Sequence, residues 1–285
     1  MLIKATLEQI NTYKDFAYEL SQDFTKSSFP TYLDNIKTKE DFMRVIDNGI
    51  NRDDEEILLF LENDEVVGWI HYYWIIEDQY IGFQTFNVEK DVENAIDEFL
   101  EYIDDKYKDF QINFGFPAAN EKAINHLIEI GYNNAEESDV FTLDMNKYIP
   151  KQESECIVEV NIDNYDDFKL LHDSHQDMYW NSDRLYNALL GQTKNKWNMY
   201  IYYEDQKPIG NIYFVYVDEM MEIFGIDIID NKEIIEHLLI KALNKTKEDN
   251  IAYSVIFTED YESMIAKKVG YDFICKYILY RNKGY

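Results

Sequence analysis

Apolar and polar residues alternate along two long stretches of the chain, and the same pattern follows in each. Residues 57–74 and residues 199–216 each show alternation, a polar turn and alternation again. They are rich in β-branched and aromatic side chains, which is typical of a β-hairpin. A third alternating segment follows each hairpin, at residues 80–86 and 222–229. The pattern therefore predicts two copies of a three-stranded antiparallel meander.

The period of the apolar positions then changes from two to nearly four in both copies. Apolar residues in 92–107 and 234–243 predict one amphipathic helix each, with Asp91 and Asp230 as N-caps. An apolar strand, a short helix ending in Gly-Tyr and closing strands complete each copy, and a strand and two helices precede it. In the first copy the preceding strand is predicted at 2–6, the two helices at 8–24 and 39–48, the apolar strand at 111–116, the end of the short helix at 131–132 and the closing strand at 140–145. In the second copy the same parts are predicted at 156–160, 165–179, 183–191, 251–257, 270–271 and 273–281.

Each copy therefore reads β-α-α-β-β-β-α-β-α-β-β. A meander followed by a helix and a strand parallel to the third strand gives a mixed, mostly antiparallel sheet with helices on both faces. The predicted fold class is α/β (α+β). The chain is expected to form two tandem domains, residues 1–147 and 153–285, joined by a linker around Pro150.

The charge balance disfavours two classes of partner. Asp and Glu number 56 against 27 Lys and Arg, a formal net charge of -29, and no block of cations is present. Binding to nucleic acid or to an anionic membrane needs clustered cations, so neither partner is expected. The acidic field favours a small amine or a basic peptide. A solvated surface that keeps the protein soluble is the simpler interpretation of the same charge.

Targeting signals and cysteines bear on location. The sequence contains no apolar run of about eighteen residues, as a membrane span would need, and its start lacks the basic and apolar segments of a signal peptide. The two cysteines, Cys156 and Cys275, lie far apart in apolar alternating segments. Reduced thiols and a cytoplasmic protein are therefore expected.

The order of elements, the glycine in each first hairpin (Gly68, Gly210) and the helix ending in Gly-Tyr together resemble the GNAT superfamily of acyl-CoA N-acyltransferases. The resemblance covers nearly the whole chain, twice. It implies that the third and fourth core strands splay apart and that the pantetheine arm of acetyl-CoA, the co-substrate, pairs with the free edge of the third strand. This edge is expected at residues 84–88 and 225–229. The residues expected to bind the co-substrate are Gln84, Thr85, Phe86, Asn87, Val88, Lys90 and Asn120.

Both copies depart from the family's motifs. The family's glycine-rich turn, which surrounds the CoA pyrophosphate with backbone N–H groups, is replaced by glycine-free acidic segments at 87–94 and 230–234. The family's Tyr four residues before the Gly, which protonates the departing thiolate, is Leu127 in one copy and Ala266 in the other, and neither donates a proton. Because the first copy keeps Asn120 where the second has Glu259, the first is expected to be the better acyl-CoA site.

Candidate catalytic residues are carboxylates near the expected mouth between the strands. Glu77 and Glu222 are the candidate bases, each able to take a proton from a substrate ammonium through water. In the family, the first helices wall the acceptor pocket, which makes His172, His175, Tyr179 and Trp180 candidate acceptor contacts. His172 and His175 lie three residues apart on a predicted helix, but no third ligand is apparent, so no metal is expected.

The leading hypothesis is an acetyl-CoA-dependent N-acetyltransferase acting on an amine-bearing acceptor, with a cationic acceptor favoured by the acidic surface and the aromatic strands. A second hypothesis is a catalytically degenerate scaffold or an acyl-CoA-sensing module, which the missing glycine turns favour. A third is a protein that binds cationic ligands and not CoA. The sequence leaves these three open.

Overall fold

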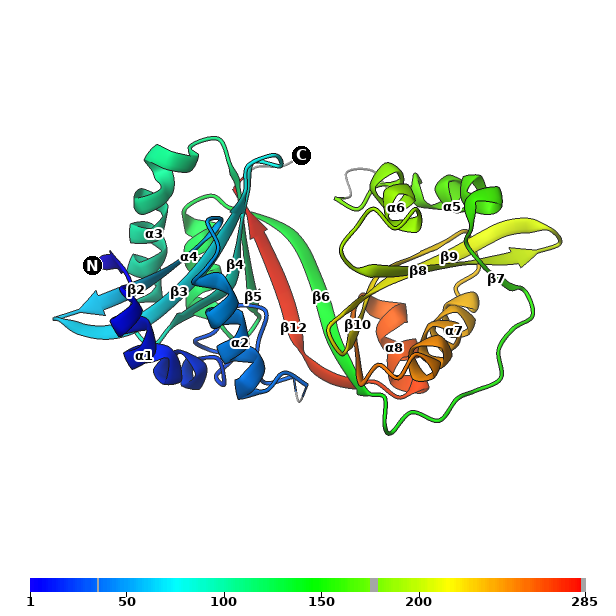
Figure 1. The fold of residues 1–285 in the computed structure, drawn as a ribbon, viewed down its shortest axis with the longest axis horizontal. Helices are drawn as coiled ribbons and strands as arrows, with labels where there is room; N and C mark the ends of the chain where they lie inside the picture. The colour runs from blue at the N-terminus through cyan, green and yellow to red at the C-terminus, as the bar shows by residue number, and fades with distance from the viewer. Residues whose placement is uncertain (35, 175–178, 283–285) are drawn as a thin grey trace. The chain divides into compact units, whose positions relative to one another are not determined.

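The computed structural model describes residues 1–34, 36–174 and 179–282 (Figure 1). The same elements follow one another in both halves of the chain. The first half contains β1 (Leu2–Lys4), α1 (Leu7–Leu20), α2 (Lys39–Gly49), β2 (Glu55–Glu62), β3 (Glu65–Ile75), β4 (Tyr80–Val88), α3 (Val92–Tyr107), β5 (Gln111–Pro117), α4 (Glu121–Glu129) and β6 (Asn133–Asp144). The second half contains β7 (Ile157–Glu159), a short 3-10 helix (Ile162–Asn164), α5 (Tyr165–His172), α6 (Ser182–Leu189), β8 (Lys196–Glu204), β9 (Lys207–Val217), β10 (Met220–Ile228), α7 (Ile234–Glu248), β11 (Tyr253–Thr258), α8 (Asp260–Val269) and β12 (Asp272–Arg281).

Local turn chemistry explains the first hairpin of each half. The central residues of the β2–β3 turn, Asn63 and Asp64, both have positive φ, and so do Asp205 and Gln206 between β8 and β9. Two successive residues with positive φ form the type I′ geometry that matches the twist of a two-stranded antiparallel ribbon, and Asn and Asp tolerate this conformation best. The hairpins predicted from the polar turns are present in both halves.

Three sequence-based expectations about local structure were wrong. Each half closes with one strand, β6 or β12, and not with two. The helix predicted over 165–179 ends at His172, and Asp173 follows as its C-cap residue, with its backbone N–H bonded to the carbonyl of Lys169. The N-cap residue of α7 is Glu233 and not Asp230, whereas Asp91 is the N-cap residue of α3 as predicted, in a left-handed conformation and without a side-chain hydrogen bond.

The compact units of the structure do not follow the two halves of the chain. One unit consists of Met1–Ser138 with Cys275–Tyr285, and the other of Asp139–Ile274. The closing strands cause this difference. β12 pairs antiparallel with β5 of the first unit, from Tyr277 opposite Pro117 to Arg281 opposite Asn113, whereas β6 pairs with β11 of the second unit (Figure 1). Each half therefore donates its last strand to the sheet of the other unit, and boundaries at 1–147 and 153–285 describe the repeat and not the compact unit.

Each unit is a sheet with helices on both faces. In the first unit the strand order is β1-β2-β3-β4-β5-β12, with only the β4–β5 pair parallel among the pairs described by register. α3 and α4 cover one face through an aromatic core around Phe99 and Phe114, and α1 and α2 cover the other around Phe42 and Trp69. The second unit repeats this arrangement, with α7 and α8 on one face and α5 and α6 on the other.

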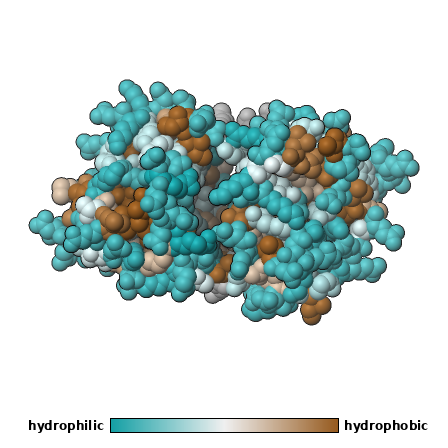
Figure 2. Space-filling view, in the orientation of Figure 1, coloured by the Kyte–Doolittle hydropathy of each residue, from teal (hydrophilic) through white to brown (hydrophobic). Residues whose placement is uncertain are grey.

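The surface is mainly hydrophilic. Figure 2 shows teal residues over most of the face in view, with smaller brown patches on each unit, in keeping with the acidic composition. None of the helices in the described ranges is both long enough and apolar enough to cross a membrane.

The exchange of closing strands predicts which unit is destabilised by a mutation in the last strand. Tyr280 is buried in the α3–α4 core of the first unit and lies opposite Phe114 of β5. We expect Tyr280→Ala to lower the free energy of unfolding by about 3 kcal/mol, since it leaves a cavity in a packed core. Amide exchange should quicken in β5 and stay unchanged in β11. The half-exposed Phe273 on the same strand offers a control, because Phe273→Ala should not affect β5. Faster exchange in β11 alone would contradict the exchange of strands.

Candidate functional site

In both units the parallel strand pair opens into a gap. β4 and β5 are paired only at Tyr80–Gln111 and Ile81–Ile112, and the strands separate beyond these residues. In the second unit, β10 and β11 are paired from Met220–Tyr253 to Ile223–Ile256 and then separate. The splayed strands that the sequence resemblance implies are therefore present in each unit.

A bulge marks the start of each gap. The register between β3 and β4 shifts between His71 and Tyr72, which leaves Gln84 without an opposite residue, and the register between β9 and β10 shifts so that Phe224 is unopposed. A bulge bends the strand and changes the direction in which the backbone groups of its edge point. The two bulges lie at equivalent positions of the repeat.

Beyond each bulge, alternate backbone N–H groups point into the gap. Glu89 donates to the carbonyl of Val67 on β3 (2.8 Å), so in an antiparallel ladder the N–H groups of Phe86 and Val88 point away from β3. The same parity holds in the second unit, where Ile229 donates to Ile209 (2.8 Å) and the N–H groups of Ile226 and Ile228 point into the gap. These four N–H groups form the edges of the two gaps.

In the first unit the chain itself fills the gap. The segment 26–29, here called the inserted segment, follows α1 and bonds to β4. The N–H of Val88 donates to the carbonyl of Lys26 (2.9 Å), and the N–H of Phe86 donates to Ser28 Oγ (2.7 Å). On its other side the N–H of Phe29 donates to the carbonyl of Gly115 on β5 (2.8 Å). The inserted segment therefore takes the place of an added strand between β4 and β5.

Two buried asparagines hold the inserted segment. Asn87 Oδ1 accepts from the N–H of Ser28 (3.2 Å), while its Nδ2 donates to the carbonyl of Ala17 at the end of α1 (3.3 Å). Asn120, which precedes α4, donates through Nδ2 to the carbonyl of Ser27 (3.2 Å). Asn87 and Asn120, predicted to bind the co-substrate, bind the protein's own backbone.

In the second unit the edge of β10 is open among the described residues. No hydrogen bond to the N–H of Ile226 or Ile228 is found from any residue in 1–34, 36–174 or 179–282. Both residues are partly exposed. The second unit therefore has no described counterpart of the segment that bonds to β4 in the first unit.

A buried ion pair lies behind this edge. His172, the last residue of α5, faces Asp227 of β10 with 3.0 Å between Nδ1 and Oδ2, and faces the carbonyl of Trp180 with 2.7 Å from Nε2. Its side chain stacks on Phe168 and meets the ring of Tyr213 edge to face. Burial alone would lower the pKa of His172, but the hydrogen bond and charge of Asp227 and the Trp180 carbonyl raise it above its ordinary value.

Aromatic side chains gather at the second bulge. Trp180 packs against Trp197 with ring centroids 4.4 Å apart, and Phe224 lies 5.1 Å from Trp197. Tyr179 packs on Trp180 and also lies under the Arg184 guanidinium (3.9 Å to the ring centroid). We call Tyr179, Trp180, Trp197 and Phe224 the aromatic cluster. Because Phe224 and Tyr179 are exposed, the cluster offers ring surface beside the opening of the gap.

The remaining predicted site residues lie in different places. Glu222 is partly buried on β10, two residues before Phe224 and within the last paired part of β10 and β11. Glu77 is exposed in the β3–β4 turn, at the end where β4 and β5 are paired, so it does not line the gap. Lys90 is exposed between β4 and α3. His175 lies outside the described residues.

Other acidic groups of the second unit interact with Asp227. Glu262 lies in the first turn of α8, and its burial, together with the charges of Glu259 and Asp227, raises its pKa above the ordinary value, partly offset by Lys232. Lys232 lies over the ring of Tyr261 at 5.7 Å from its centroid. This lysine is the cation of the β10–α7 connection, which has no glycine between Ile229 and Glu233.

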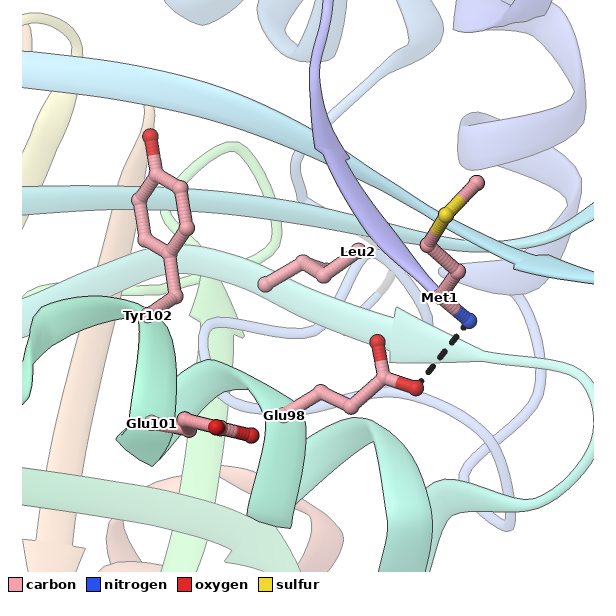
Figure 3. Close-up of a pocket in the computed structure, with 5 residues that line it drawn as sticks. All are labelled: Met1, Leu2, Glu98, Glu101 and Tyr102. Carbon is pink, nitrogen blue, oxygen red and sulfur yellow. Dashed lines mark ion pairs between the residues drawn. The ribbon is translucent and has the colours of Figure 1, made fainter.

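Neither a metal centre nor the pocket of Figure 3 offers an alternative site. The described ranges contain no group of three His, Cys, Asp or Glu side chains that could hold a metal ion. Figure 3 shows a pocket beside α3 lined by Met1, Leu2, Glu98, Glu101 and Tyr102, with the Met1 ammonium 3.1 Å from Glu98. This pocket lies at β1, which β2 and β3 separate from β4 and its gap.

Sequence reasoning missed the inserted segment and the exchange of strands. One signal for the segment was present: the connection between the first two helices spans residues 21–38 in the first unit but only 173–181 in the second. The longer connection contains the small residues Ser27 and Ser28, which fit between two strands. The preserved Asn120 pointed to the first copy as the better site, but this asparagine holds the inserted segment.

Comparison with known proteins identifies the fold. No family model and no curated protein matches the chain. Among solved structures, a GCN5-related N-acetyltransferase from Sphaerobacter thermophilus is similar with a TM-score of 0.66 and 9% identity over 99% of this chain and 95% of that chain. A tandem GNAT protein from the clavulanic acid biosynthesis pathway is similar with a TM-score of 0.57 and 9% identity, over 99% and 97% of the two chains. A GCN5-related glucosamine N-acetyltransferase region of a fungal multi-domain β-N-acetylglucosaminidase is similar with a TM-score of 0.60 and 12% identity, over 99% of this chain and 38% of that one.

These likenesses establish the architecture. The chain has the GNAT fold, twice, as in the tandem protein, and the predicted fold class is confirmed. Identities this low speak for the fold alone, so the reaction has to be argued from the site.

The inserted segment predicts a local cost for losing one hydroxyl. Ser28 is buried, and its Oγ accepts from the N–H of Phe86. We expect Ser28→Ala to lower the free energy of unfolding by about 1–2 kcal/mol, because it leaves a buried backbone N–H without a partner. Exchange of the Phe86 amide should quicken more than that of its neighbours. Thr25→Ala, at an exposed position, should change stability by less than about 0.5 kcal/mol. Unchanged Phe86 exchange in Ser28→Ala would show that the segment does not fill the gap in solution.

Proposed function

We propose that the protein is an acetyl-CoA-dependent N-acetyltransferase and that acyl-CoA binds in the second unit, along β10. The observation that carries the proposal is the contrast between the two gaps. The N–H groups of Ile226 and Ile228 are open among the described residues, whereas the equivalent groups of Phe86 and Val88 bond to the inserted segment. A pantetheine arm carries two amides and can bond to such an edge as an added strand would.

The second unit fits the arm better than it fits the diphosphate. The open N–H groups supply the donors that the arm's carbonyls need. The β10–α7 connection, however, offers only Lys232 as a cation and has Asp230 and Glu233 beside it. Binding is therefore expected to depend mainly on the arm and on Lys232, and to be weaker than in a site with a glycine-rich turn.

Glu222 is the best-placed base for the proposed reaction. In acetyl transfer, the amine nitrogen forms a bond to the thioester carbonyl carbon, the carbon–sulfur bond breaks, and the sulfur leaves as a thiolate. Before attack, the ammonium loses one proton to Glu222 through water, and as the amide forms the nitrogen loses a second proton to water. The thiolate takes a proton from solvent, because Ala266 occupies the place of the family's tyrosine. Positioning supplies much of the rate in such a reaction.

The aromatic cluster suits an amine that carries positive charge. Ring faces attract ammonium groups, and the net charge of -29 draws cations toward the protein. A small cationic amine or the amino group of a basic peptide is the proposed acceptor. A cytoplasmic location is proposed with it, since acetyl-CoA is the co-substrate and both cysteines are free thiols.

A second candidate function is an acyl-CoA-sensing module without turnover. The missing glycine turn and the missing thiolate acid at Ala266 favour it. The first unit, closed by its inserted segment, has a structural role under either function. Turnover with a panel of amines separates the two: sensing requires bound acetyl-CoA and no acetylated product.

Amide hydrogen exchange tests the place of binding without a mutation. On adding acetyl-CoA, we expect the amides of Ile226 and Ile228 to exchange more slowly, because they gain hydrogen bonds. Phe86 and Val88, the equivalent amides of the first unit, are the internal control and should not change. Protection at Phe86 and Val88 would place the ligand in the first unit, and no protection at either pair would remove the proposal.

Replacing each candidate base tests the catalytic assignment. We expect Glu222→Gln to lower kcat about a hundredfold or more while leaving the dissociation constant of acetyl-CoA nearly unchanged, since a positioned base contributes at least this factor. Glu77→Gln, at the closed end of the first gap, is the matched control and should retain wild-type kcat. Equal effects of the two changes would argue that neither carboxylate takes the proton.

A further inference from the structure

His172 is held between two hydrogen-bond acceptors. Its side chain is almost completely buried, at 1% exposure, and Asp227 is 4% exposed. Nδ1 faces a carboxylate oxygen of Asp227 at 3.0 Å, and Nε2 faces the carbonyl oxygen of Trp180 at 2.7 Å. A neutral imidazole has one N–H and one bare nitrogen, so it would leave a lone pair facing an oxygen. Only the imidazolium donates to both partners.

The surroundings of His172 favour that charge. Asp227 on β10 carries the compensating carboxylate, and the C-terminus of α5 presents the negative end of the helix dipole. Two further titratable groups face His172. Tyr213 on β9 meets its ring edge to face, and Asp173 follows His172 directly in the chain. Asp173 is paired with Lys169 at 2.8 Å, and the charges of Glu262 and Asp227 interact.

The two partners of His172 belong to different parts of the proposed site. Asp227 lies on β10 between Ile226 and Ile228, whose N–H groups are open toward the gap. Trp180 packs on Trp197, and both contact Phe224 at the bulge. The imidazolium therefore connects the strand proposed to bind acyl-CoA with the aromatic cluster proposed to receive the amine.

We propose that His172 is a positioning residue whose protonated ring holds Trp180, and with it the aromatic cluster, in register with the open edge of β10. This inference rests on the proposed function for its effect on catalysis, but the charged link itself does not. His172 touches neither co-substrate nor acceptor and takes no part in proton transfer. It sets the distance between the amine and the thioester.

The first unit shows what replaces this link when the gap is closed. Asn87 occupies the position of Asp227 in the repeat, and Leu20 ends α1 where His172 ends α5. Asn87 joins α1 and the inserted segment through hydrogen bonds of its neutral side-chain amide. The neutral Asn87 holds the inserted segment inside the first gap. The charged pair of Asp227 and His172 instead holds Trp180 beside the second gap.

The link should weaken as the pH rises. Because the pKa of His172 is raised above its ordinary value, its contribution to stability is complete below the ordinary pKa of about 6.5. It is lost as the pH passes through the raised value. Asp227→Asn removes the charge that raises the pKa, and so should move the loss to lower pH.

The test uses the whole protein without ligand. In protein labelled with ¹⁵N-histidine, both ring nitrogens of His172 should be protonated below the ordinary pKa of about 6.5, and the midpoint for proton loss should lie above that value. The indole N–H signal of Trp180 should move with the same midpoint. His172→Gln identifies the ring signals, and Asp227→Asn should lower the midpoint. A His172 ring that loses its proton at or below about pH 6.5, or a Trp180 signal that does not change with this titration, would overturn the proposal even if the variants failed to fold.

Kinetics then separate this inference from the proposed function. His172→Gln should raise KM for the amine about tenfold and leave the dissociation constant of acetyl-CoA within about twofold, since it displaces the acceptor side of the site. His126→Gln in α4, where His126 pairs with Asp97 at 2.7 Å, is the matched control and should change neither. A titrating link without turnover of any amine would remove the proposed function and keep the link. Turnover with unchanged KM for the amine in His172→Gln would remove the positioning role.

Discussion

Backbone N–H groups at the edge of a splayed strand need hydrogen-bond partners, and this requirement organises both units. A parallel pair that opens after a bulge leaves alternate N–H groups without a strand to bond. The first unit satisfies Phe86 and Val88 with its own inserted segment, at the entropic cost of ordering that segment. In the second unit, no residue in the described ranges bonds to the N–H groups of Ile226 and Ile228. The same architecture thus gives one gap that the chain fills and one gap whose edge no described residue covers.

The repeat made the fold predictable from the sequence. The sheet that each closing strand joins was not predictable. Alternation at residues 57–74 and 199–216 identified the hairpins, because the alternating pattern depends only on the side chains within each strand. The pairing of β12 with β5 depends on which sheet edge the strand meets, and an alternating pattern fits either edge equally well. Only contacts distant in sequence, such as Tyr280 beside Phe114, distinguish the two outcomes.

The candidate site was predictable in position but not in occupancy. Residues 84–88 and 225–229 do form the edges of the two gaps, as the order of elements implied. Asn120 misdirected the choice between them, because an asparagine before a helix bonds a ligand amide and a peptide group of the chain equally well. His172 and Trp180 could be suspected from their place at the end of the first helix of the second copy and just after it. Their mutual hydrogen bond could not, since the predicted helix ran past His172.

One position of the repeat carries much of the difference between the units. Asn87 can donate and accept at once, so it bonds both Ala17 of the first helix and Ser28 of the inserted segment. An ionised Asp227 only accepts, and it therefore needs a donor from the first helix, which His172 supplies. A buried carboxylate without that partner would be strongly destabilising. The Asp227 carboxylate and the His172 imidazolium therefore form, between β10 and α5, the link that the Asn87 amide forms between β4 and α1 in the first unit.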